Sequence, residues 1–313
     1  MSELSIIIPY VNEYPQIMFT IQNLMCELDG RVDYEIIAIN NYIHWPPQCT
    51  SEDKGFEVIG NLAQRHGSIF KSFHYKDKLS HWNAKNFGIQ KSTGKYLFFC
   101  DGHCLVGRDC LYQMFNYYKQ HEQEINGTLH LPISYMLEKK GWELIYKPVI
   151  DLSKGELHYT FSRYRPSTNG KHYQVPCMST CGMMISKKLM VEELNMWPTE
   201  MGIYGGGENF VNYSLAVMGY NINIFPKPSI FHYAEARGYR WIGSDWNRNR
   251  LIAMYIACGE ELAELLAKDL KGSPETNQRI FEEVVIKCDP HREHIKKRTR
   301  VDIFEWANRW KSF

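Results

Sequence analysis

Short apolar runs alternate with segments of helical spacing along the first hundred residues of the chain. The runs are rich in β-branched or aromatic residues and most end at Pro, Asn or Gly, which is typical of buried strands. The predicted strands cover residues 5–9, 34–39, 68–75 and 96–100, and the predicted helices cover 17–28, 56–65 and 82–90. This alternation predicts an α/β fold with a largely parallel sheet and right-handed crossovers.

The remainder of the chain is less regular and then becomes helical. Strands are predicted at 127–136, 157–161 and 221–225, and helices at 111–121 and 208–218, with a further helix beginning at 189–194. Apolar residues 178–185 return to the core, whereas the polar stretch 162–174 predicts a mobile loop. Helical spacing then predicts helices at 252–270, 274–286 and 298–310. The pattern divides the chain into a domain of residues 1–240 and a helical extension of residues 241–313.

The apolar run at 96–100 stops at Asp101, Gly102 and His103. The carboxyl end of a strand is where open α/β sheets place their ligands. In an extended chain, Asp101 and His103 point to the same side and can converge on one point. A carboxylate and an imidazole suit a divalent ion such as Mn²⁺. The tripeptide alone fits ordinary turn residues equally well, so the remaining motifs must decide.

Composition excludes some classes of protein. The 313 residues carry 36 basic and 35 acidic side chains, so no global charge favours nucleic acid. Nine cysteines without a paired C-x-x-C framework predict reduced, buried thiols rather than disulfides or zinc. No apolar run approaches the roughly 18 residues that span a bilayer. The first residues lack a basic, apolar leader, so we expect a cytoplasmic protein without membrane insertion.

Three separated blocks between residues 5 and 232 resemble nucleotide-sugar glycosyltransferases of family 2 with the GT-A fold. The first is SIIIPYVNE at 5–13, and the second runs from AKNFGI at 84–89 to YLFFCDGH at 96–103. The third runs from CGMM at 181–184 through YGGGEN at 204–209 to the FH pair at 231–232. The D-x-H variant and the adjoining Cys104 are similar to polypeptide N-acetylgalactosaminyltransferases. The resemblance implies a mixed sheet with helices on both faces.

The resemblance also implies a metal site and a donor substrate. Asp101, His103 and His232 would hold Mn²⁺ or Mg²⁺, whose charge neutralises the diphosphate leaving group of a UDP-sugar. The family often carries an Asp at the end of the second strand, where this chain has two asparagines, so the identity of the base is open. The implied nucleotide- and diphosphate-binding residues are Pro9, Tyr10, Glu13, Asn40, Asn41, Lys85, Asn86, Gly102, Arg237 and Arg240. Trp82 is expected in the core.

Glu208, at the start of a helix after three glycines, is the implied acceptor-binding residue and general base, and Asp101 completes the catalytic pair. The Glu208–Asn209 sequence leaves retaining and inverting chemistry both open. The expected acceptor is a glycan or glycolipid precursor. The compact chain also faintly resembles bacteriophage transferases, some of which modify hydroxymethylated pyrimidines in DNA, and the basic stretch 291–300 can meet phosphates.

Two other classes of function remain as alternatives. One is a degenerate GT-A protein that binds nucleotides or glycans without catalysis. The intact Asp101, His103, Glu208 and His232 argue against this alternative. The other is a nucleotidyltransferase of related fold. Such an enzyme would carry a Gly-rich, basic phosphate loop after the first strand, and residues 11–14 (VNEY) do not have that composition.

Overall fold

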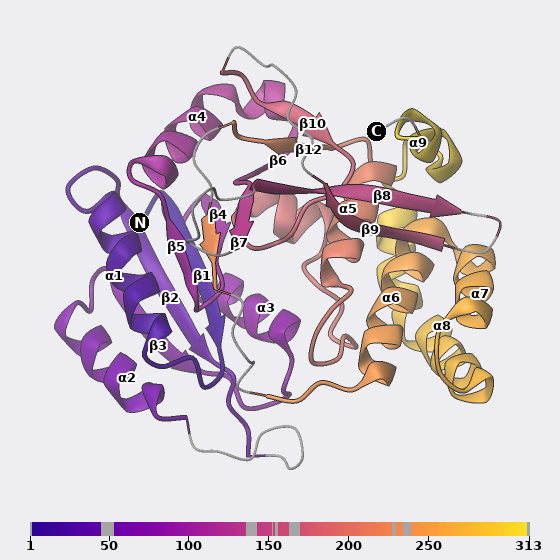
Figure 1. The fold of residues 1–313 in the computed structure, drawn as a ribbon, viewed down its shortest axis with the longest axis horizontal. Coiled ribbons are helices and arrows are strands. Elements are labelled where there is room, and N and C mark those ends of the chain that lie inside the picture. The colour runs from indigo at the N-terminus through magenta and orange to yellow at the C-terminus, as the bar shows by residue number, and fades with distance from the viewer. Residues whose placement is uncertain are drawn as a thin grey trace.

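The computed structural model describes residues 2–44, 53–135, 143–151, 153, 156–162, 170–226, 230–233 and 239–311. Its centre is an eight-stranded mixed sheet (Figure 1). The neighbours β3 (Phe70–His74), β2 (Tyr34–Asn40), β1 (Leu4–Tyr10) and β4 (Tyr96–Phe99) are parallel. The sheet continues through β11 (Met183–Ser186), β6 (Gly127–His130), β12 (Asn221–Ile224) and β10 (Tyr173–Val175). Of these, β11 and β10 run against their neighbours, so the predicted parallel order holds with two reversals.

Alternate side chains of the central strands enter two different cores. In β1, Ile6 and Ile8 pack with α1 (Gln16–Leu28), α2 (Gly55–Arg65) and α4 (Cys110–Ile125). Ile7 instead packs with α3 (His81–Lys91), α5 (Gly207–Val217) and the C-terminal helices. A strand buried on both faces needs apolar residues at every position, which explains its uninterrupted β-branched run. Helices on both faces of a mixed sheet confirm the predicted fold class.

A second sheet of five strands brings distant segments to the end of β4. Its order is β5 (Cys104–Val106), β13 (Ile230–His232), β7 (Ile133–Tyr135), β8 (Glu143–Asp151) and β9 (Glu156–Ser162). Strand β13 pairs antiparallel with β5, and this register sets His232 opposite Cys104. The backbone N–H of Tyr233 also donates to the carbonyl of His103 at 3.1 Å. This pairing fixes His232, the third predicted metal ligand, beside the D-x-H motif.

The C-terminal helices close one face of the large sheet. They are α6 (Gly243–Cys258), α7 (Glu260–Asp269), α8 (Pro274–Lys296) and α9 (Ile303–Arg309). Helix α6 lies against α5 and α8, and apolar residues of all four join the same core as β1 and β4 (Figure 1). The described helices include none that is both long and apolar enough to cross a membrane. The domain boundary predicted at residue 240 stays a prediction, because the extension shares this core.

Several predicted elements differ in the structure. The strand predicted at 127–136 is two strands in different sheets, since Pro132 between them has no N–H to continue a ladder. The helix predicted at 252–270 breaks at Gly259, whose φ of +101° no helix accommodates. The helix beginning at 189 is one π-helical turn, Leu189–Glu193. Helix α8 runs through Pro290 to Lys296, well beyond the predicted end at 286, and α9 begins only at Ile303.

Four short or distant strands, β5, β8, β10 and β13, were not predicted from the pattern. Part of the loop expected at 162–174, residues 163–169, lies outside the described residues. Tyr173 and Gln174, placed in that loop, instead begin β10.

Candidate active site

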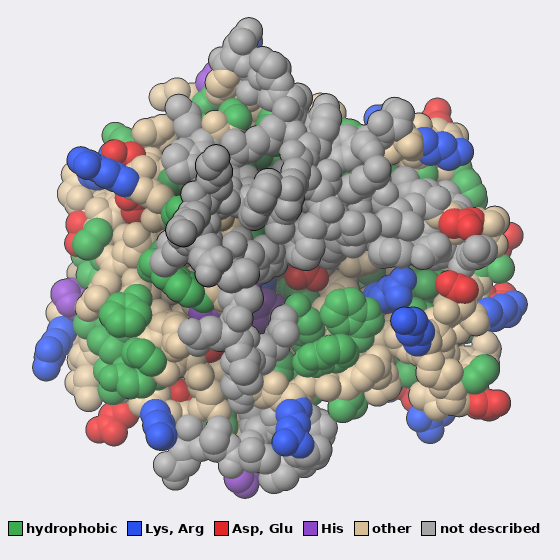
Figure 2. Space-filling view, viewed as in Figure 1, with side chains coloured by type: hydrophobic (Ala, Val, Ile, Leu, Met, Phe, Trp, Pro, Cys, Tyr) green, Lys and Arg blue, Asp and Glu red, His purple; other side chains and the backbone are tan. Residues whose placement is uncertain are grey.

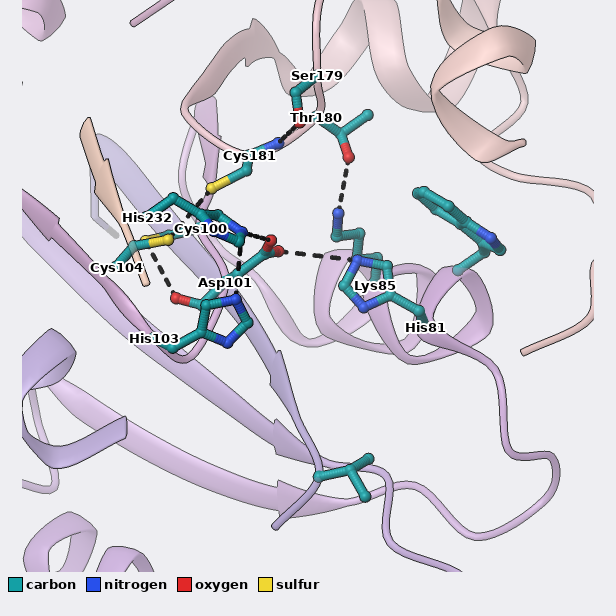
Figure 3. A network of polar contacts seen from close by, with 12 residues as sticks. His81, Lys85, Cys100, Asp101, His103, Cys104, Ser179, Thr180, Cys181 and His232 are labelled. Carbon is teal, nitrogen blue, oxygen red and sulfur yellow. Dashed lines mark hydrogen bonds and ion pairs between the residues drawn. The ribbon is translucent and has the colours of Figure 1, made fainter. Parts of the chain in front are cut away.

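The D-x-H motif lies directly after β4, and His232 reaches it from β13 (Figure 3). The Nε2 atom of His232 lies 3.3 Å from Oδ2 of Asp101 and 3.1 Å from Nε2 of His103. The three side chains are 17–22% exposed, so they are largely buried and still reachable from solvent. Figure 2 shows histidine side chains reaching the surface near the centre of this face. The structure therefore brings together all three predicted metal ligands.

Glu13 holds His103 in place from the loop after β1. One carboxyl oxygen of Glu13 is hydrogen-bonded to Nδ1 of His103, and the other accepts the backbone N–H of Val11 at 3.2 Å. With Nδ1 engaged, Nε2 of His103 faces His232 and Asp101. A carboxylate behind a histidine is the usual way in which a ligand imidazole is oriented toward a metal. Glu13 was predicted to line the nucleotide site, and its contact with His103 was missed.

Gly102 makes this approach of the Glu13 loop possible. A Cβ atom at position 102 would lie 2.9 Å from Oε2 of Glu13 and 3.2 Å from Cβ of Tyr10. Any larger residue would push the loop away from His103. The glycine of the D-x-H motif therefore serves close packing, and its predicted contact with a ligand stays untested.

Charges of both signs surround Asp101. Burial opposes its ionisation, but the hydrogen bond with His232 and the charges of Lys85 and His81 hold the pKa of Asp101 well below its usual range. Its Oδ1 atom is buried with no hydrogen-bond partner among the described residues, and Nε2 of His81 is 3.8 Å away. Burial likewise disfavours a charged His103, yet Glu13 and Asp101 raise the pKa of His103 to about 9. The site is therefore arranged to hold positive charge next to an ionised carboxylate.

Lys85 lies close to this site and is fully buried among three aromatic rings. Its Nζ donates to Oγ1 of Thr180 at 2.9 Å and lies 5.0–5.7 Å from the ring centres of Trp82, Phe99 and Trp197. Burial lowers the pKa of Lys85, while the negative charges of Asp101 and Glu208 oppose that decrease. The side chain has no exposed surface, so its charge acts through space rather than by direct contact with a ligand.

Glu208 stands in the first turn of α5, after three glycines of which Gly205 and Gly207 lie close to aromatic rings. The indole N–H groups of Trp82 and Trp197 donate to the carbonyls of Gly205 and Gly207 at 3.2 and 3.1 Å. A Cβ atom at Gly207 would lie 2.4 Å from the ring of Trp82. The glycines thus let the backbone lie flat on the same tryptophans that surround Lys85, which brings Glu208 within electrostatic reach of Lys85. Trp82 is fully buried, as predicted.

Two predicted donor-binding asparagines are engaged with the backbone in the structure. The amide of Asn86 donates to the carbonyl of Trp197 at 2.7 Å and accepts its backbone N–H at 3.0 Å. Asn41 in the same way donates to the carbonyls of Tyr75 and Lys78 and accepts the N–H of Ser80. Both amides are buried, and their predicted contact with the donor stays a prediction.

The other predicted donor-binding residues lie near the carboxyl ends of β1 and β2 or after β13. Pro9 and Tyr10 are buried at the end of β1, and Asn40 ends β2. The side chain of Asn40 donates to Asp53, which also accepts the backbone N–H of Asn12 at 3.2 Å. Arg240 is exposed in the segment before α6, and Arg237 lies outside the described residues.

Sequence reasoning missed Asp53 and His81 as members of the site. Asp53 follows β2 by a long loop, and no pattern predicted that its carboxylate would return to Asn40. His81 begins α3, where the periodicity indicated only a helix start. Neither residue lies directly at a predicted strand end, so a search for acids and histidines at those ends would not have found them.

The donor set fits a divalent cation. Two imidazole nitrogens and a carboxylate oxygen converge, the second oxygen of Asp101 has no hydrogen bond within the described residues, and Glu13 fixes the orientation of His103. Mixed oxygen and nitrogen ligands suit Mn²⁺ and are acceptable to Mg²⁺ through the carboxylate and added phosphate oxygens. The residues that would hold the ion are Asp101, His103 and His232.

Solved structures of two other proteins are similar to this one. The structure is similar to that of GalNAc-T7 in complex with UDP, GalNAc and Mn²⁺, with a TM-score of 0.68 and 16% identity over 93% of this chain and 57% of that one. It is also similar to residues 1–349 of S. aureus TarS in complex with UDP-GlcNAc, with a TM-score of 0.55 and 10% identity over 92% and 73% of the two chains. This chain thus spans little more than half the length of GalNAc-T7.

No curated protein sequence matches the chain. Residues 5–192 match the family described as Glycosyl transferase family 2. Because this match covers more than half of the sequence, the chain belongs to glycosyl transferase family 2, and its structure has the GT-A fold.

Proposed function

We propose that this enzyme transfers a sugar from a UDP-sugar to a hydroxyl group of a glycan acceptor, with Mn²⁺ or Mg²⁺ held by Asp101, His103 and His232. One observation carries the proposal. Three donor side chains from two segments about 130 residues apart meet beside a buried carboxylate oxygen that has no hydrogen-bond partner among the described residues. The names of the similar structures, which include UDP, Mn²⁺ and UDP-GlcNAc, support the choice of donor.

The bound ion would act as a Lewis acid on the departing diphosphate. The chain's own residues prepare the site for it. Glu13 orients His103, and Lys85 lies behind Asp101 and favours the ionised carboxylate. Tyr10 and Asn40, with Asp53 beside them, are the proposed walls of the nucleoside site. Arg240 is the proposed diphosphate contact from the solvent side.

Glu208 is the proposed acceptor-binding residue and general base. It stands at the amino terminus of α5, and its charge reaches Lys85 together with that of Asp101. Because both carboxylates raise the pKa of the same buried ammonium, a donor on Asp101 and an acceptor on Glu208 would lie near each other. The anomeric configuration of the product would decide between retaining and inverting chemistry.

An aromatic cluster beside the glycine loop suits a ring-shaped acceptor. The rings of Tyr204, Trp241 and Trp246 lie 5.6–6.2 Å apart between centroids, and Trp241 is 44% exposed. The ring of Trp246 packs so closely on Gly205 that a Cβ there would lie 2.6 Å from it. Exposed aromatic faces next to an acidic group are a suitable surface for the apolar face of a sugar.

The DNA acceptor has less support. Within the basic stretch 291–300, Arg298 pairs with Glu193 and Lys296 with Glu293, while His291 and His294 contact the backbone carbonyls of Leu194 and Glu193. These contacts reduce the charge offered to a phosphate backbone. A DNA acceptor and a bacteriophage origin stay predictions.

Release of UDP from UDP-GalNAc and UDP-GlcNAc, with Mn²⁺ and a panel of glycans, tests the proposal. We expect Mn²⁺-dependent release that Asp101→Ala abolishes, while Asp269→Ala, at an exposed acid on α7, retains it. Full activity in excess chelator would remove the metal from the proposal. Modification of hydroxymethylated DNA, with salt-sensitive binding and no transfer to glycans, would replace the glycan acceptor. Absence of any nucleotide binding would favour the degenerate alternative.

A further inference from the structure

Three buried thiols lie directly behind the proposed metal ligands. Cys100 and Cys104 flank the D-x-H motif, and Cys181 comes from the segment before β11. Their exposed fractions are 1%, 1% and 3%, and all three are free cysteines. The sulfur atoms of Cys104 and Cys181 are 3.5 Å apart, while Sγ of Cys100 contacts the backbone carbonyl of Asp101 at 3.4 Å. The metal chemistry proposed above uses none of these thiols.

Two of the thiols form a compact donor set with Asp101 and His232. One ligand atom from each of Cys104, Cys181, Asp101 and His232 lies within 4.8 Å of all the others. Metal–ligand bonds of tetrahedral zinc place donor atoms roughly 3.3–3.8 Å apart. The pair His232 Nε2 and Asp101 Oδ2, at 3.3 Å, and the two sulfur atoms, at 3.5 Å, already have that separation. Small side-chain shifts would complete the remaining distances.

The side of His232 on which an ion lies decides which donors it meets. Figure 3 shows the sulfur atoms of Cys104 and Cys181 on one side of His232, and Lys85 and His81 on the other side of Asp101. On the thiol side the set is two sulfurs, one imidazole and one carboxylate, which is a soft set that Zn²⁺ prefers. With His103 in place of the thiols, the set contains only nitrogen and oxygen, as Mn²⁺ prefers.

We propose that Cys104, Cys181, His232 and Asp101 form a second, overlapping site that binds Zn²⁺ and excludes an ion from the Asp101, His103 and His232 set. Binding replaces the two thiol protons with two sulfur–zinc bonds and releases both protons to solvent. The exclusion follows because both sets need Asp101 and His232. Divalent affinities rise from Mn²⁺ to Zn²⁺, so Zn²⁺ would inhibit at concentrations well below those of the activating ion. The claim that Zn²⁺ excludes the activating ion rests on the proposed function, whereas the claim that the four residues bind Zn²⁺ does not.

The geometry also provides a route for the ion. Asp101 and His232 are 19% and 17% exposed, whereas the two thiols are enclosed. An ion would meet the carboxylate and imidazole first and then move inward to the sulfurs. Cys177, which lies four residues before Cys181 and is equally buried, belongs to the core on the other face of the sheet. It offers a matched thiol outside the proposed site.

The absorption spectrum of the full chain loaded with Co²⁺ tests the sulfur ligands and requires no enzymatic activity. A phosphine reductant keeps the thiols reduced during the measurement. We expect a thiolate-to-cobalt charge-transfer band that Zn²⁺ removes. Cys104→Ser and Cys181→Ser should each lower the intensity of the band by about half or more and weaken Zn²⁺ binding by about 100-fold or more, since each removes one of two thiolate ligands. The double variant should lose the band, and Cys177→Ser should leave band and binding unchanged. A wild-type protein without the band, or single variants that keep its full intensity, would overturn the proposal.

Binding of Mn²⁺, measured by electron paramagnetic resonance in the same samples, separates this site from the proposed function. Zn²⁺ should displace Mn²⁺ from the wild type, and in Cys181→Ser about 100-fold more Zn²⁺ should be required. If Zn²⁺ fills the thiol site while Mn²⁺ stays bound, the exclusion is wrong. If the wild type shows the cobalt band but never binds Mn²⁺, the proposed function fails and the zinc site stands. If a serine variant melts at a lower temperature than the wild type, the alanine variant at the same position is used in its place. The cobalt band of the wild type needs neither variant, so it tests the sulfur ligands in any case.

Discussion

Two buried carboxylates stand at opposite ends of the parallel strands, and their surroundings differ in kind. Glu35, at the amino end of β2, accepts hydrogen bonds from Ser5, Lys71 and both the backbone and side chain of Thr93. Asp101, beyond the carboxyl end of β4, accepts one from His232, and its Oδ1 has none among the described residues. Protein groups satisfy both carboxylate oxygens of Glu35, whereas Oδ1 of Asp101 can still bind a ligand from outside the chain.

The electrostatics sharpen this contrast. Burial opposes ionisation of Glu35, but the hydrogen bonds from Lys71, Ser5 and Thr93 lower its pKa to about 2. The pKa of Asp101 is also lowered, by His232 and by the charges of Lys85 and His81. The first carboxylate is paired with an ammonium and with hydroxyl and backbone donors, whereas the second lies beside two imidazoles, of His232 and His81, that can themselves bind an ion. A buried charge stabilises a fold where it is fully paired and serves chemistry where it is not.

The largest effect should come from Asp101. Asp101→Asn keeps the shape of the side chain and removes the charge that an ion needs, so UDP-sugar turnover should fall by about 10³-fold or more. The free energy of unfolding should change less than in a Glu35 variant, because one hydrogen bond is affected rather than four. Turnover measured as UDP release and urea unfolding of the same sample check both statements. Activity within tenfold of wild type would place the metal elsewhere.

Glu35 should show the reverse result. Glu35→Gln keeps an oxygen for Ser5 and Thr93 but turns an amide N–H toward Lys71, which loses its partner, so the free energy of unfolding should fall by about 2–3 kcal/mol. Turnover per folded molecule should stay near the wild-type value, since Glu35 lies at the end of the sheet away from Asp101. Urea unfolding measures the loss. The control is Glu264→Gln, which breaks an exposed pair with Lys268 and should cost about 0.5 kcal/mol or less.

This contrast also shows how far the sequence alone can predict the structure. The strand that ends before Asp101 was predicted because its apolar run and turn residues are local signals. The role of Glu13 was not, since its partner His103 is 90 residues away and no periodicity links them. Asn86 and Asn41 were assigned to the donor from the family resemblance. In the structure their amides bond to backbone atoms of other segments, which no side-chain pattern reveals.

The position of His232 shows a second limit. Its motif context suggested a ligand, but only the pairing of β13 with β5 sets it opposite Cys104. Both strands have three residues, too few for a periodic signal. Of the eight cysteines in the described residues, six are buried as predicted, whereas Cys26 is exposed and Cys258 is partly exposed. Their reduced state stays a prediction. That two of them converge on His232 depends on the same pairing, so it emerged only from the structure.

Glu13 offers a smaller test of the contrast, because it acts on the site through His103. Glu13→Ala should weaken Mn²⁺ binding by about 10- to 100-fold, the usual cost of losing the carboxylate behind a ligand histidine. Glu13→Gln should lose less, since its amide oxygen can still accept from Nδ1. Titration of Mn²⁺ by electron paramagnetic resonance measures the affinity directly. Equal affinities in the wild type and the alanine variant would show that His103 needs no such support.

The smallest effect concerns the pH dependence of the stability that Glu35 provides. Its folded pKa of about 2 lies below the ordinary value of 4.5, so the folded state favours the ionised form. This contribution is complete above pH 4.5 and is lost as the pH falls toward 2, because the unfolded chain takes up the proton first. The difference in unfolding free energy between the wild type and Glu35→Gln should therefore be constant from about pH 7 to 5 and shrink by about 1 kcal/mol near pH 3.5. Urea unfolding of both proteins across that range measures it. A difference that stays constant down to pH 3.5 would mean that Glu35 is held by shape rather than by charge, and the contrast with Asp101 would then rest on hydrogen bonding alone.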